Sequence, residues 1–197
     1  MFCWNPPNPR LGDTMKMVRY GKLLFWIGIL SATLYARDYS VREDSQIGFS
    51  VGKFLVLNVE GRFQKFSGTL TLDAQNQISA LKGEVAIDSI TTENAKRDTH
   101  LLAPDFLDAA NFPTARLSLV SYTPHASEDS SKITGKLTAL LELHGKSQHI
   151  EFDSILVPKS DNPKLSLHGE INIKDFGIEG SMMNSNTVTI ELQTEWE

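Results

Sequence analysis

The sequence predicts an all-β protein, an up-and-down antiparallel β-barrel of about eight strands with one short helical crossover insertion. Apolar and polar residues alternate with a period of two along most of the chain after residue 38, and short polar segments separate the alternating runs. Residues 91–113 alone lack the alternation. Long antiparallel strands with one apolar face bury it either in a sandwich or in a closed barrel, and sequential hairpins with short turns favour the barrel. A barrel of about eight strands is just wide enough to hold one small ligand.

The N-terminal part of the chain reads as a leader that precedes the barrel. Residues 23–34 form an uncharged run that follows basic residues, which is typical of a signal peptide and short for a membrane span of about 20 residues. We therefore expect a signal peptide over residues 15–36, with cleavage near Ala36 and a periplasmic or secreted domain over residues 37–197. Residues 1–14 fit neither leader nor fold and are read as an over-extended start.

Composition restricts the function further. Cys3 is the single cysteine and lies in the over-extended start, so disulfides and thiolate chemistry are not expected in the mature chain. Residues 37–197 keep 15 Lys and Arg against 23 Asp and Glu, a formal charge of -8. The chain has no long basic run, so we expect no nucleic-acid partner, and the cleaved leader leaves no stable membrane anchor.

The alternation is clearest in three segments. Residues 133–144, 165–174 and 188–193 each place apolar residues or glycine on one face and mostly polar residues on the other. Weaker alternation covers residues 47–51 and 85–87. Leu140 is an apolar exception on an otherwise polar face, which leaves open a homodimer that would cover it.

Residues 91–113 predict the crossover. Pro104 suits the first turn of a helix, so the sequence predicts a short helix over residues 104–110 that covers one side or end of the barrel.

Several motifs in and around this crossover are similar to those of one known family. The segments that carry the resemblance are Thr91–Leu101 (TTENAKRDTHL), Asp105–Asp108 (DFLD), Asn111–Pro113 (NFP), Gly135–Thr138 (GKLT) with Gly145, Lys174–Ile178 (KDFGI), Tyr39–Val41 (YSV) and Gly61–Phe63 (GRF). These segments resemble the YceI-like family, and the resemblance covers residues 38–196. The chain departs from the family pattern at residues 44–53, which hold no histidine, and at Lys174, where the family often has arginine.

The resemblance implies an exported, lipocalin-like barrel that encloses a long apolar chain and needs no cofactor. On that basis we expect a binding protein for a polyisoprenoid, an isoprenoid quinone, or a fatty acid or amide, acting as carrier, store or scavenger. Two other functions stay open: a lipid-modifying enzyme that uses Asp98 and His100, and a structural or interaction protein with a filled core.

The segment Arg97–Leu101 (RDTHL) allows three interpretations. Arg97 and Asp98 could form a polar clasp where the crossover meets the barrel, because buried charged groups need partners. They could instead form a polar rim that meets a ligand's head group. An acid–base site at His100 would need a nucleophile or an oriented water, and no Ser or Cys motif accompanies it.

The candidate binding residues fall into two sets, and no residue is predicted to be catalytic. The apolar lining is predicted from inward strand positions and the crossover: Phe49, Val51, Phe54, Phe63, Phe66, Leu101, Phe106, Phe112, Leu137, Ala139, Leu141, Leu167, Ile171 and Phe176. The polar rim is predicted at Arg97, Asp98, His100 and Asp175. Glycines at 135 and 169 suggest space inside the barrel, although glycine also marks strand bends. His144 and His149 flank a turn without a third ligand, so no metal site is expected.

Overall fold

The computed structural model describes residues 1, 3, 36–53, 57–125, 127, 129–160, 162–180 and 184–197, and the described residues from 36 onward form one compact unit. Its elements in chain order are β1 (Arg37–Ser40), β2 (Gln46–Lys53), β3 (Leu57–Phe63), β4 (Phe66–Leu72), β5 (Ile78–Ala86), η1 (Ile87–Ser89), β6 (Ile90–Thr91), α1 (Ala95–Leu101), β7 (Thr114–His125), β8 (Ile133–Leu143), β9 (Lys146–Val157), β10 (Lys164–Asn172), η2 (Ile173–Phe176) and β11 (Asn184–Glu195).

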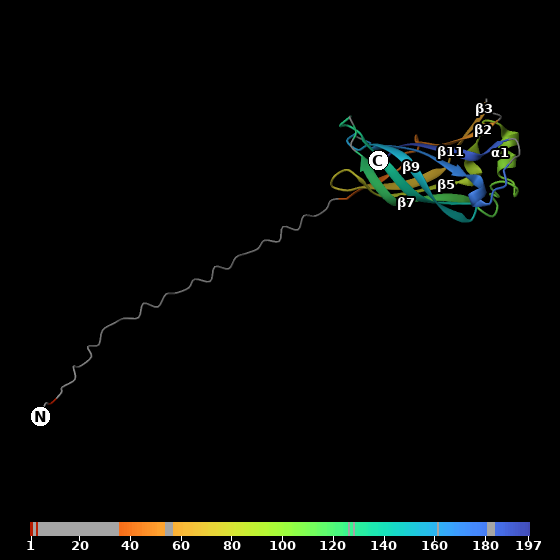
Figure 1. The fold of residues 1–197 in the computed structure, drawn as a ribbon. Coiled ribbons are helices and arrows are strands. Elements are labelled where there is room, and N and C mark those ends of the chain that lie inside the picture. The colour runs from red at the N-terminus through yellow and green to blue at the C-terminus, as the bar shows by residue number, and fades with distance from the viewer. Residues whose placement is uncertain are drawn as a thin grey trace. The chain divides into compact units, whose positions relative to one another are not determined.

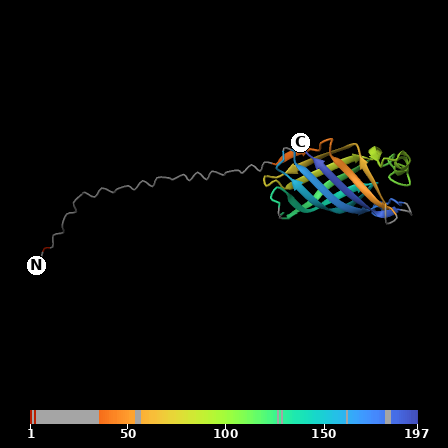
Figure 2. The same ribbon diagram turned by 90° about the horizontal axis from the view of Figure 1, so that it is seen from above.

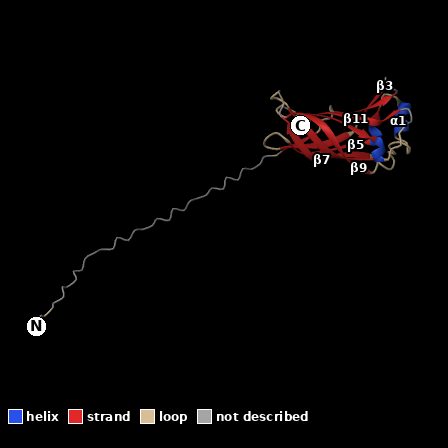
Figure 3. Cartoon of the chain, viewed as in Figure 1, coloured by secondary structure: helices blue, strands red, loops and turns tan. Residues whose placement is uncertain are grey.

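The strands form one antiparallel sheet that curls into a barrel, as the sequence predicts (Figures 1 and 2). The order across the sheet is β1-β4-β5-β7-β8-β9-β10-β11-β2-β3-β6. The described residues form 11 strands rather than about eight, because β1 has four residues and β6 has two, too few to show alternation in the sequence. Figure 3 shows strands dominating the barrel, with the helical segments gathered at one end.

At one end of the barrel, the wall is closed by pairing between the two termini of the domain. β1 pairs with β4, and the chain after β1 also meets the chain after β11. Ser40 N donates to Glu197 O at 2.7 Å, and Glu197 N donates to Ser40 O at 2.9 Å. The β1 segment therefore joins β4 to the end of β11 and closes the wall there. Figures 1 and 2 place this closed end opposite α1.

The hairpin between β8 and β9 turns at His144 and Gly145. Both residues have positive φ, 52° and 71°. Positive φ at both central residues is typical of tight two-residue hairpin turns, whose twist matches the twist of the flanking strands. β9 consequently starts at Lys146, so most of the turn expected between His144 and His149 is strand. Leu143 and Lys146 are paired across the turn, which fixes the register of both strands.

The helix lies earlier in the crossover than the sequence predicted. The side chain of Asn94 accepts a hydrogen bond from Arg97 N at 3.1 Å and caps the first turn of α1, whose Ala, Lys and Arg residues favour helix. The expected helix over residues 104–110 is wrong: that segment consists of turns, in which Phe106 N and Asp108 N both donate to Ala103 O. The Leu107 amide, which would donate to Ala103 O in a helix, donates to Leu101 O at 3.1 Å instead.

The interior of the barrel divides into two regions. At the closed end, buried side chains from five strands and the C-terminal segment pack into a solid core, which we call the end core: Leu70, Leu72, Ile78, Leu81, Leu137, Ala139, Phe152, Leu156, Leu165, Leu167 and Trp196. A second cluster is built around Leu141, Ile171, Phe176, Ile178 and Val188, and it packs against Phe106 and Leu107 in the turns that follow α1. This second region surrounds a cavity.

Candidate functional site

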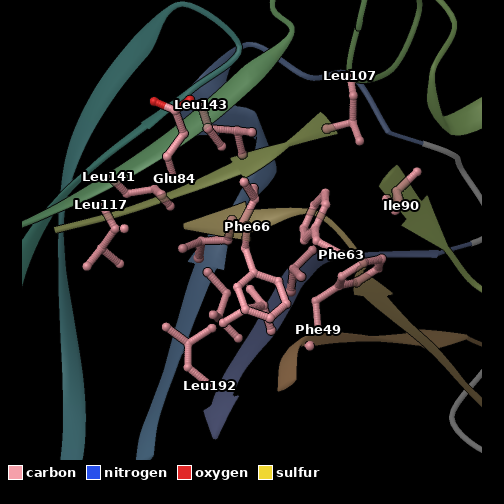
Figure 4. Close-up of a pocket in the computed structure, with 18 of the residues that line it drawn as sticks. Phe49, Phe63, Phe66, Glu84, Ile90, Leu107, Leu117, Leu141, Leu143 and Leu192 are labelled. Carbon is pink, nitrogen blue, oxygen red and sulfur yellow. The ribbon is translucent and has the colours of Figure 1, made fainter. Parts of the chain in front are cut away.

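The barrel holds a cavity of about 710 Å³. Its wall is built by β2, β3, β4, β5, β7, β8, β10 and β11, and residues of α1 and the following turns line one end. The lining side chains are predominantly leucine, isoleucine, valine and phenylalanine, and Figure 4 shows them converging from several strands on one space. This size and chemistry are those of a pocket for one apolar ligand.

Nine of the predicted lining residues line this cavity. They come from five strands and the crossover: Phe49, Val51, Phe63, Phe66, Leu101, Phe106, Leu141, Leu167 and Ile171. Phe49 and Phe63 meet with their ring centroids 5.9 Å apart, and the Phe49 ring lies over Gly61, where any Cβ would overlap it. Phe54 lies outside the described residues.

Four other predicted lining residues lie elsewhere. Leu137 and Ala139 point inward on β8 but are fully buried in the end core, where Leu137 is paired with Phe152. Phe176 is fully buried in η2, and Phe112 packs against the His144 ring at 4.6 Å. Inward direction alone was therefore not enough to predict lining, because the closed half of the barrel is filled.

The glycines expected to leave space instead receive neighbouring side chains. A Cβ at Gly169 would come within 2.7 Å of the Phe152 ring, and a Cβ at Gly135 within 2.9 Å of the Tyr122 ring. Neither glycine lines the cavity. Both let aromatic rings close the end core.

Arg97 and Asp98 form the polar clasp that the sequence suggested. Asp98 Oδ1 accepts from Thr92 N at 2.8 Å and from Thr92 Oγ1 at 2.5 Å, and Asp98 Oδ2 lies 3.4 Å from Thr91 Oγ1. Arg97 donates from Nε and Nη2 to the hydroxyl and carbonyl oxygens of Thr92, both at 2.7 Å. These bonds hold α1 against the end of β6.

The predicted polar rim is only partly assembled. Arg97 and His100 line the cavity, whereas Asp98 is occupied in the clasp and Asp175 lies outside the cavity. Lys96 also lines it and, like His100, is exposed to solvent, so the cavity reaches the surface at this end. We call this the α1 end of the cavity.

His100 makes an exposed pair with Asp105. His100 Nε2 lies 3.1 Å from Asp105 Oδ2, and the His100 ring packs edge-on against Phe106 at 5.1 Å. The hydrogen bond with His100 lowers the pKa of the Asp105 carboxyl below its ordinary value. Whatever stability this pair contributes is therefore present above that ordinary pKa and is lost as the pH falls through the lowered value.

Some lining residues were not predicted, although the sequence pattern indicated that they point inward. Val188, Ile190 and Leu192 line the cavity from β11, and their alternation was already visible in the sequence. Trp196 also lines it but follows β11 as a lone aromatic residue near the C-terminus, where no pattern indicates direction.

Two features are absent from the described part of the chain. No group of three or more His, Cys, Asp or Glu side chains in it is placed to hold a metal ion. None of its helices has the length and apolar character needed to cross a bilayer.

The clasp yields a prediction about local stability. Asp98→Ala removes the acceptor for the Thr92 amide and should cost about 1–3 kcal/mol of local stability. We expect faster hydrogen exchange at the Thr92 amide and in α1. The matched control is Asp105→Ala, which removes only the exposed pair with His100 and should leave exchange at Thr92 unchanged. Unaltered protection of Thr92 in the Asp98 variant would show that the clasp does not hold the helix.

Comparisons with known proteins agree with this architecture. The family model of the YceI-like domain matches residues 39–196. A UPF0312 protein of Pseudomonas aeruginosa is 32% identical over 180 residues, which cover 86% of this chain and 88% of that protein. Among solved structures, Burkholderia cenocepacia BcnA aligns with a TM-score of 0.67 at 15% identity, covering 77% of this chain and 95% of BcnA.

Two more solved structures share the fold. A polyisoprenoid binding domain from Saccharophagus degradans aligns with a TM-score of 0.62 at 16% identity, over 81% of this chain and 97% of that domain. The Campylobacter jejuni YCEI protein aligns with a TM-score of 0.58 at 26% identity, over 73% of this chain and 88% of that protein.

Proposed function

The chain belongs to the YceI-like family, and from this premise we propose that it is a binding protein that encloses one long apolar lipid inside its barrel. The observation that carries the proposal is the cavity of about 710 Å³ with its largely apolar lining. A filled barrel would have favoured a structural role. The polyisoprenoid binding domain of S. degradans, which has the same fold, supports an isoprenoid or another long hydrocarbon chain as the ligand class.

Apolar burial alone is strong enough for useful affinity. A chain that buries about 400 Å² at about 25 cal/mol per Å² gains roughly 10 kcal/mol. Association and immobilisation of the chain remove several kcal/mol of this. Micromolar affinity or better is therefore reachable without an ion pair, and the polar side chains at the α1 end would orient the head group.

We infer binding without catalysis. Both carboxylate oxygens of Asp98 are taken up by Thr91 and Thr92, which leaves Asp98 badly placed to act as a base on a cavity ligand. His100 is paired with Asp105 at the surface. The alternative, a lipid-modifying enzyme acting through Asp98 and His100, would require turnover of a lipid that His100→Ala abolishes.

We also propose that the protein works outside the cytoplasm, in the periplasm or after secretion. This rests on the leader-like residues 15–36 of the sequence. Carriage, storage and scavenging of the lipid all fit such a location.

Native mass spectrometry of the purified full-length protein tests the proposed function. We expect a bound species of lipid mass that organic solvent removes and that added isoprenoid alcohols or fatty amides restore. A control chain with Leu141→Glu should copurify without the lipid. The proposal fails if the protein carries no lipid and binds neither class.

A further inference from the structure

The cavity ends where the end core begins, and some residues are part of both. Four residues are members of the end core and also line the cavity: Leu81, Leu165, Leu167 and Trp196. Trp196 is by far the largest of them and is only 3% exposed. It lies near the C-terminus, at the end of the barrel opposite α1 (Figures 1 and 2). We call these four residues the cavity floor.

The indole of Trp196 is fixed in place by a chain of buried hydrogen bonds. Trp196 Nε1 donates to Thr194 Oγ1 at 2.9 Å, and Thr194 Oγ1 donates to Leu165 O at 2.8 Å. The Trp196 backbone is held as well, because its N donates to Pro163 O at 3.0 Å and Val41 bridges to it. An indole N–H that lost this partner inside an apolar core would carry a desolvation cost, so the ring has little freedom to turn aside.

A fixed floor limits the length of chain that the barrel can bury. If a methylene group in a close-packed chain takes about the volume of one liquid water, roughly 30 Å³, the cavity holds about two dozen carbon atoms. That corresponds to four or five isoprene units. A longer chain must leave its remainder outside, beyond the α1 end.

From this geometry we propose that Trp196 sets the length specificity of the cavity, so that the ligand class is a lipid with a buried chain of about 20–25 carbons. This rests on the proposed lipid-binding function. Thr194 is a positioning residue, since it acts by holding the indole. Affinity rises with each unit that the cavity buries and stops rising once the chain reaches the floor.

The test measures the affinity of the full-length protein for isoprenoid alcohols of three, four, five and eight units by calorimetry. In the wild type, each added unit up to the limit should raise affinity at least about tenfold, because each buried CH₂ contributes favourably. The eight-unit alcohol should bind no more tightly than the five-unit one. An affinity that keeps rising through eight units would overturn the length limit while leaving lipid binding intact.

Substitution at the floor should move this limit. Trp196→Ala removes the ring atoms beyond Cβ, which frees space for at least one more isoprene unit. The chain length at which affinity stops rising, which we call the plateau, should therefore increase. Trp196→Leu serves if the alanine variant folds poorly, and should shift it less. Phe152→Leu is the control: Phe152 is equally buried in the end core but does not line the cavity, so it should lower stability without moving the plateau. An unchanged plateau in both Trp196 variants would refute the assignment.

Intrinsic fluorescence provides a second readout. In a chain with Trp4→Phe and Trp26→Phe, Trp196 is the remaining tryptophan. Its emission should change when the added alcohol is long enough to reach the floor and should stay unchanged with shorter alcohols that still bind. Thr194→Val keeps the size of the side chain but removes both hydrogen bonds. In this variant the emission of Trp196 should change gradually with alcohol length instead of at one length. If no alcohol of any length binds, the proposed function itself fails.

Discussion

Leu141→Glu is expected to abolish lipid binding, with affinity falling by more than about a hundredfold, the equivalent of about 2.7 kcal/mol. Leu141 lies on β8, is 8% exposed and lines the apolar cavity. A carboxylate there must either stay hydrated inside the cavity or lose its water when the lipid enters, and both are costly. Displacement of a fluorescent fatty acid from the purified variant measures the loss.

The neighbouring residue provides a matched control for this prediction. Leu140 lies on the opposite face of the same strand, paired with Ser118 and His149. Leu140→Glu adds the same charge to the same strand and should leave lipid affinity within about twofold of wild type, a change of roughly 0.4 kcal/mol. Equal losses in the two variants would mean that the ligand does not occupy the interior of the barrel.

Phe152→Ala is expected to cost about 3–5 kcal/mol of unfolding free energy, the range for a large buried aromatic side chain. Phe152 is fully buried in the end core, where its ring closes over Gly169. The surrounding strands cannot collapse into the space without breaking the ladders that hold them. Urea denaturation followed by circular dichroism measures the difference.

Phe66→Ala should cost much less unfolding free energy than Phe152→Ala, because the two residues lie in different parts of the interior. Phe66 is on β4 and lines the cavity, so part of its ring already faces open space (Figure 4). Its removal enlarges an existing cavity instead of creating one, and the cost should be well below that of Phe152→Ala. A comparable loss at the two positions would indicate that the cavity is not open in solution.

The strands could be predicted from the sequence because a strand that is buried on one face alternates apolar and polar residues with a period of two. The prediction of long strands over residues 133–144, 165–174 and 188–193 is confirmed by β8, β10 and β11. The short strands β1 and β6 could not be predicted, because their pairing depends on β4 and β3, which are distant in the sequence.

The candidate site was predictable only in part, for a physical reason. Alternation shows which side chains point inward but not how far along the axis each one lies. Leu137 and Leu141 are four residues apart on the same face of β8, yet the first is fully buried in the end core and the second lines the cavity. What separates them is the packing of Phe152 and its neighbours, which no local pattern encodes.

The exchange of hydrogen bonds between Ser40 and Glu197 has a practical consequence for how the protein is handled. The first strand and the last residue of the domain leave the barrel side by side, at the pole opposite α1. An affinity tag, a fusion partner or a linker to a sensor chip attached after residue 197 therefore lies at the closed end of the barrel, away from α1. A molecule immobilised in this way presents its open pole to the solution, so ligand exchange can be followed on a surface without steric obstruction by the anchor.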